Sequence, residues 1–237
     1  MRPGPRTQEQ LTRFGREWEQ GQHVLLSGAT RSGKTTLARH VVQKRIDAGG
    51  FVIVLVCKLR PDATIVNDYK GFTRWETFKK KPNRSENRVL LWPDLQGMPA
   101  RKAMAIQREI FREAYDGISE VGNWTVQTDE GLYVCNPKFL GLEPELAMLH
   151  ALGGSAGVTN VVLTQRPSHL PVVIYGSAHH AFVGRTRERT DAQRLSELGG
   201  RQSGKEMLAT VAELKQREFL WIPVAPDWPS EIVDVSK

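Results

Sequence analysis

A glycine-rich stretch close to the amino end holds the residues best suited to binding phosphate. Residues 28–35 fit the pattern G-x-x-x-x-G-K-[ST], with Gly28, Gly33, Lys34 and Thr35 at its fixed positions. Glycine lets the backbone approach closely, so consecutive N–H groups can surround phosphate oxygens. Lys34 would reach the β- and γ-phosphates, and the Thr35 hydroxyl would ligate Mg²⁺. We therefore expect this loop to bind a nucleoside triphosphate through Gly28, Ala29, Thr30, Arg31, Ser32, Gly33, Lys34, Thr35 and Thr36.

An acidic pair forms a second candidate site. Residues 123–128 alternate in the way that predicts a strand, and Asp129 and Glu130 follow it directly. Asp129 would hold the Mg²⁺ shell, and Glu130 would act as the general base that polarises the attacking water. The alternative is that the two acids only cap a turn before Gly131.

A third polar group ends another apolar run. Residues 159–163 predict a strand that stops at Thr164-Gln165-Arg166-Pro167, because proline cannot continue a central strand. A side-chain amide at a strand tip can sense a γ-phosphate or position water. Spacing alone favours the simpler interpretation, in which Gln165 is an ordinary loop residue.

The elements that must position these groups indicate an α/β fold. An apolar strand at residues 23–26 precedes the phosphate loop, and a helix over residues 36–48 follows it. The uniformly apolar run 51–56 predicts an interior parallel strand, and the resulting β–α–β order favours a mostly parallel, doubly wound sheet with helices on both faces. Further helices are expected at 7–20, 100–118, 143–152, 190–198 and 203–214, and further strands at 88–92, 178–183 and 218–223. Turns are expected over 58–88, a flexible connector at 153–157, and an irregular tail up to residue 237.

Composition limits the class of protein. The chain has 237 residues, 40% of them hydrophobic and 25% charged, and no apolar run approaches the roughly 20 residues of a membrane span. We therefore expect no membrane association. Cys57 and Cys135 show no metal or redox spacing, which favours reduced thiols in a cytoplasmic compartment. A formal net charge of +7 favours an anionic partner.

The densest basic cluster lies at residues 78–84. Its cations could contact a nucleic-acid backbone, with Trp75 and Phe78 as stacking groups. A solvated surface loop explains the same charges equally well. The candidate DNA-binding residues are Lys79, Lys80, Lys81 and Arg84.

Three stretches taken together resemble the FtsK/HerA superfamily of P-loop ATPases: residues 28–35, Asp129-Glu130 and residues 164–167. The resemblance covers about residues 21–223 and implies an additional-strand ATPase core. We therefore expect a motor domain at 21–224, preceded by a helical extension at 1–20 and followed by a tail at 225–237. In such a core the glutamine-bearing strand lies between the phosphate-loop strand and the Asp-Glu strand. It also implies ATP and Mg²⁺ as ligands, Gln165 as the γ-phosphate sensor, and a homo-oligomeric ring, usually a hexamer, that moves double-stranded DNA.

The chain departs from the family pattern in two places. Arg31 stands where the family commonly has glycine, so the apex of the loop is reshaped or carries an extra charge. The family often has an arginine before the glutamine-bearing strand, whereas this chain has Gly153-Gly154-Ser155. Arg185 and Arg187, which follow the strand at 178–183, could instead stabilise phosphoryl-transfer charge across a subunit interface. The alternative for each is a solvated basic turn.

The resulting hypothesis is ATP-driven DNA translocation by a ring-forming motor, for DNA packaging or transfer by a virus or mobile element. Such a motor would work in the cytoplasm of the host or in the virion. Two alternatives remain open at this point: a P-loop kinase for a small molecule, and a nucleotide-gated ATPase for virion or secretion assembly that moves no DNA.

Overall fold

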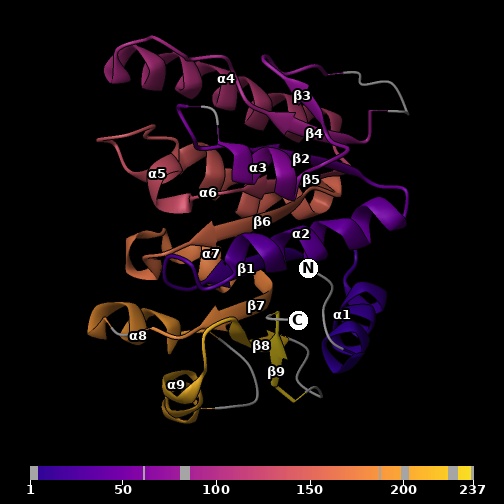
Figure 1. The fold of residues 1–237 in the computed structure, drawn as a ribbon, viewed down its shortest axis with the longest axis vertical. Coiled ribbons are helices and arrows are strands. Elements are labelled where there is room, and N and C mark those ends of the chain that lie inside the picture. Colours follow the sequence, from indigo (N-terminus) through magenta and orange to yellow (C-terminus); the bar gives the residue numbers. More distant parts are fainter. Residues whose placement is uncertain are drawn as a thin grey trace.

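The computed structural model describes residues 5–60, 62–80, 86–186, 188–198, 203–223 and 229–235, with only the backbone described at 5–7. These residues form a nine-stranded sheet in the order β3-β4-β2-β5-β6-β1-β7-β8-β9 (Figure 1). The strands are β1 (His23–Ser27), β2 (Phe51–Leu55), β3 (Thr73–Trp75), β4 (Arg88–Leu91), β5 (Trp124–Thr128), β6 (Thr159–Thr164), β7 (Ala178–Gly184), β8 (Glu218–Pro223) and β9 (Glu231–Asp234). The ladder is parallel from β3 to β7, and β8 and β9 extend it with antiparallel pairs.

Helices cover both faces of this sheet, as the sequence predicts. One buried apolar cluster joins the sheet to α1, α2 and α3, and the other joins it to α4, α6, α7 and α9. The side chains of β1 divide between them, because Val24 and Leu26 lie in the first cluster and Leu25 in the second. The helices are α1 (Pro5–Glu17), α2 (Lys34–Asp47), α3 (Ala63–Asp68), α4 (Ala100–Val121), α5 (Gly131–Cys135), α6 (Glu143–Leu152), α7 (Val172–Gly176), α8 (Arg189–Leu195) and α9 (Gly204–Glu213).

The strand order confirms the additional-strand arrangement. Strand β6, which carries Thr164, pairs in parallel with β1 on one side and with β5 on the other. Ser27 at the end of β1 lies opposite Thr164, while Thr128 at the end of β5 lies opposite Val162. The three strands therefore deliver the phosphate loop, the acidic pair and Gln165 to one edge of the sheet.

Several local expectations are wrong. The region 58–88 contains α3 and β3, residues 153–156 form a 3₁₀ turn, and the tail contains β9, which pairs with β8. The sequence of α4 predicts one buried apolar stripe, made of Ala103, Ile106, Ile110, Ala114 and Ile118. Ala103, Ala114 and Ile118 are buried, but Ile106 and Ile110 are only half-buried, and Gln107 and Phe111 are fully buried beside them. Gln107 is buried because its Nε2 donates to the backbone oxygen of Val56 at 2.9 Å.

Within the described residues, no helix combines the length and the apolar character that crossing a membrane requires. The division of the chain into an extension, a motor domain and a tail stays a prediction.

Candidate nucleotide site

The phosphate loop is the turn between β1 and α2, and its backbone has the shape that the motif requires. Gly33 precedes α2 with a left-handed φ of 97°, which favours glycine. The N–H of Gly28 donates to the backbone oxygen of Thr164 at 3.2 Å, so the loop is attached to the end of β6 where it begins. Arg31 is also left-handed, with φ of 62°. The position where the family commonly has glycine thus keeps the glycine-like conformation.

Lys34 lies over this loop. Its Nζ donates to the backbone oxygens of Gly28 at 2.6 Å and Ala29 at 2.9 Å, and the residue is 8% exposed. Burial lowers the pKa of Lys34, while the charges of Glu130 and Asp129 act in the opposite direction. The ammonium group is therefore poised at the loop, between its carbonyl oxygens and the two acids.

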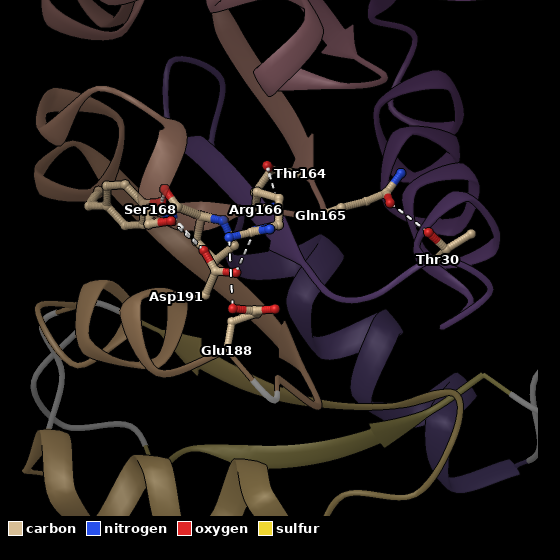
Figure 2. A network of polar contacts seen from close by, with 9 residues as sticks. Thr30, Thr164, Gln165, Arg166, Ser168, Glu188 and Asp191 are labelled. Atoms are coloured by element: carbon tan, nitrogen blue, oxygen red, sulfur yellow. Dashed lines mark hydrogen bonds and ion pairs between the residues drawn. The ribbon is translucent and has the colours of Figure 1, made fainter.

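Gln165 connects the three candidate segments. Its Oε1 accepts a hydrogen bond from the Thr30 hydroxyl at 2.6 Å, and its Nε2 donates to Oε2 of Glu130 at 3.0 Å. Figure 2 shows the Gln165 side chain reaching toward Thr30. The structure thus brings together the phosphate loop, the end of β5 and the end of β6 at Gln165. Its contact with a γ-phosphate stays a prediction.

The acidic pair lies in surroundings that favour proton uptake. Burial, with a smaller contribution from the neighbouring Glu130 charge, raises the pKa of Asp129 to about 6. Burial also raises the pKa of Glu130, partly offset by Lys34 and by hydrogen bonds from Gln165. A carboxylate with a pKa closer to neutrality is a better match for general base catalysis.

The residues present fit a Mg²⁺–triphosphate complex. Oε1 of Glu130 and Oγ of Ser32 are buried without a hydrogen-bond partner, so polar groups of the site still lack a ligand. Thr35, in the first turn of α2, and Asp129, after β5, supply the hydroxyl and carboxylate oxygens that Mg²⁺ prefers. These two residues would hold the metal.

A cavity of about 560 Å³ lies beside the phosphate loop. Its walls include residues 28–32, Gln165, Arg185 and residues 215–218, all from this one chain. Arg185 therefore faces the same cavity as its own phosphate loop. Arg187 lies outside the described residues.

The basic cluster is not the stacking platform that the sequence suggests. Trp75 is only 2% exposed and packs in the core, and the half-buried Phe78 lies against it with ring centroids 6.3 Å apart. The ammonium of Lys79 lies 3.7 Å from Glu86, and that of Lys80 pairs with Glu120 on α4. Both lysines remain more than half exposed. Lys81 and Arg84 lie outside the described residues, and the DNA contact of the cluster stays a prediction.

The sequence interpretation missed Ser168 and Asp191. Asp191 lies within the helix expected at 190–198, with no further role predicted, and in α8 it accepts hydrogen bonds from Ser168, directly after the glutamine motif. No spacing pattern links the two residues, because the contact depends on how β7 returns α8 to the end of β6.

No family model and no curated protein sequence matches the chain, whereas many solved structures share its fold. The DNA-packaging ATPase B204 of Sulfolobus turreted icosahedral virus is similar, with TM-score 0.64 and 18% identity over 92% of this chain and 98% of that one. The genome-packaging NTPase B204 of Sulfolobus turreted icosahedral virus 2 in complex with ATP-gammaS has TM-score 0.62 and 18% identity over 90% and 96%. The pCW3 conjugation coupling protein TcpA with ATPgS has TM-score 0.53 and 15% identity over 91% and 60%. The chain therefore shares the fold of these DNA-packaging and conjugation coupling proteins.

Proposed function

We propose that this chain is an ATP-hydrolysing motor that moves double-stranded DNA, acting with Mg²⁺ as a ring of identical subunits, most simply a hexamer. One observation carries the proposal: Gln165 joins the phosphate loop to Glu130 through two hydrogen bonds. The similar structures named as DNA-packaging and conjugation coupling proteins support DNA as the partner.

The chemistry follows from the site residues. Lys34 would exchange its bonds to the loop carbonyls for bonds to the β- and γ-phosphates. Bound Mg²⁺, held by Thr35 and Asp129, would neutralise charge on those phosphates. Glu130 would take the proton of the attacking water through its unpartnered Oε1. The Gln165 amide, already beside Glu130, would contact the γ-phosphate.

The positive net charge of the chain supports an anionic partner that binds outside the nucleotide site. The chain carries a formal net charge of +7, and we propose Lys79, Lys80, Lys81 and Arg84 as contacts to the DNA backbone. Arg185 and Arg187 would stabilise phosphoryl-transfer charge. The motor domain would span residues 21–224 and would serve DNA packaging or transfer, in the cytoplasm of a host or in a virion.

The test is the rate of phosphate release with Mg²⁺–ATP, with and without duplex DNA. We expect hydrolysis that duplex DNA stimulates. Hydrolysis without stimulation or translocation would favour an assembly ATPase. Phosphate transfer to a small acceptor, with little free phosphate, would favour a kinase.

A further inference from the structure

The loop that carries Gln165 presents two neighbouring side chains in opposite directions. Gln165 reaches Thr30 on the phosphate loop, while Arg166 points toward Asp191 and Glu188 (Figure 2). Gln165 itself is exposed, so close packing does not fix its amide. Its placement depends on its hydrogen bonds to Thr30 and Glu130, and on how the backbone of the loop is held within reach of them.

Asp191 holds that backbone from the other side. Its Oδ1 accepts hydrogen bonds from the N–H of Ser168 at 3.0 Å and from the Ser168 hydroxyl at 2.6 Å. Its Oδ2 lies 2.9 Å from Nε of Arg166. Asp191 is 1% exposed, and a buried carboxylate depends on such partners. The Asp191 side chain therefore contacts the loop on both sides of Pro167, at Arg166 and at Ser168.

The loop is attached at further points as well. The backbone oxygen of Thr164 accepts from Gly28 at 3.2 Å, and its hydroxyl accepts from the N–H of Arg166 at 3.1 Å. The Tyr175 hydroxyl donates to the backbone oxygen of Pro167. Among these contacts, those of Asp191 are the ones that involve a charged side chain from α8.

We propose that Asp191 is a positioning residue: its buried carboxylate fixes the loop 164–168 so that the Gln165 amide stays between Thr30 and Glu130. The inference rests on the proposed ATPase function. Asp191 lines the wall of the cavity beside the phosphate loop but bonds to neither Lys34 nor Glu130 in the contacts above, so we assign its effect to Gln165. Loss of its charge should slow turnover and leave nucleotide binding by the phosphate loop intact.

The experiment is a double-mutant cycle with Asp191→Asn, Gln165→Ala and the two combined. We expect Asp191→Asn to lower kcat by about 10-fold, the scale of a small misplacement of a catalytic group, with the Kd for ATP changed less than about 2-fold. The combined variant should be no slower than Gln165→Ala alone, because both changes remove one interaction. Glu145→Gln is the matched control, since the Glu145 carboxylate of α6 also pairs with an arginine, Arg112 of α4, and makes none of the loop contacts described above. It should keep wild-type kcat.

Amide hydrogen exchange gives a readout that needs no ATP. Asp191→Asn should speed exchange over residues 165–169, whereas Glu145→Gln should not. If Asp191→Asn fails to fold, Arg166→Gln tests the same contact from its partner, with the same expected loss of kcat. Because Arg166 also lines the cavity beside the phosphate loop, the Kd for ATP of this variant must again change less than about 2-fold. The inference would be overturned if the loss of kcat in the combined variant equalled the product of the two single losses. Wild-type kcat in Asp191→Asn or in Arg166→Gln would also overturn it. A wild-type protein without ATPase activity would instead remove the proposed function.

Discussion

Glu130 combines an acceptor oxygen without a partner, Oε1, with a second oxygen, Oε2, that Gln165 holds in place. Replacing it by glutamine preserves size and removes the basic carboxylate. We expect Glu130→Gln to bind ATP normally and to lose turnover by about 10²-fold or more, the scale of a lost general base. Nucleotide binding by fluorescence and phosphate release separate the two effects. Near-normal turnover in Glu130→Gln would make Glu130 a structural residue only.

Lys34→Ala removes the ammonium group that lies over the phosphate loop. We expect this variant to lose nucleotide binding or turnover in the same two assays. Unchanged hydrolysis would contradict the assignment of the phosphate loop.

Arg31 carries backbone strain at the apex of the phosphate loop. A side chain at its φ of 62° costs on the order of 1–2 kcal/mol, which glycine avoids. Arg31→Ala removes the guanidinium and keeps the strain, whereas Arg31→Gly removes both. We expect Arg31→Gly to be more stable than Arg31→Ala by about 1 kcal/mol, after the greater freedom of glycine in the unfolded chain is subtracted. Chemical denaturation measures the difference. Equal stabilities would mean that the loop relaxes around either residue.

Neutral histidines join β1, β6 and α6. Nδ1 of His23 accepts from the N–H of Asn160 at 3.0 Å, and its Nε2 donates to the backbone oxygen of His150 at 3.1 Å. The two imidazoles are 4.5 Å apart. Burial, with a smaller contribution from His179, lowers the pKa of His23 to about 4. Protonation of the ring would break the Asn160 contact and place a charge in the core.

This burial predicts a pH dependence of stability. Between pH 6.5 and 4 the unfolded chain binds a proton at His23 that the folded chain does not, so stability falls as pH falls through that window. We expect the advantage of wild type over His23→Asn to shrink by about 2 kcal/mol from pH 7.5 to 5. Urea denaturation at both pH values measures it. Val41→Ala, a buried change in α2 that involves no titratable group, is the control and should show no such change. A constant difference for His23→Asn would contradict this account.

The sequence predicts elements well where a long apolar run or a motif defines them. The motif-bearing strands β1, β5 and β6 and the helix α6 lie where expected, and β6 lies between its predicted neighbours. Short elements were missed because tertiary pairing creates them: β3 exists against β4, and β9 against β8. The buried face of α4 was misjudged because a polar residue, Gln107, finds its partners only in the folded chain. For the same reason the role of Asp191 could not be read from spacing.

The contribution of the basic cluster to duplex binding can be separated from the contribution of the net charge of the whole molecule. Replacing Lys79, Lys80 and Lys81 together by glutamine should weaken duplex binding and reduce the salt slope of log K by about 2 to 3, roughly 0.9 per lost phosphate contact. The matched control replaces Lys102, Lys138 and Lys205, which are exposed and lie elsewhere, with the same loss of charge. Titrations at several salt concentrations compare the two. Equal slopes in both triple variants would mean that the cluster is ordinary surface.

Assembly decides whether Arg185 acts on its own nucleotide or on that of a neighbour. Because Arg185 lines the same cavity as its own phosphate loop, we expect it to act within one subunit. Arg185→Ala and Glu130→Gln would then each inactivate the subunit that carries them. A mixture of the two proteins should hydrolyse ATP no faster than the separate preparations do in total.

If Arg185 instead served the adjacent subunit, mixed assemblies would contain interfaces with an intact Glu130 on one side and an intact Arg185 on the other. Activity above the sum of the separate preparations would then appear, and would place the arginine in trans. A mixture of wild type and Glu130→Gln is the control for subunit mixing. If the two proteins assemble together and neighbouring sites are coupled, the activity per wild-type subunit should change. Sedimentation of differently tagged chains with Mg²⁺–ATP and duplex DNA should show the joint assembly directly, so that an absence of rescue reports the geometry of Arg185 and not a failure to assemble.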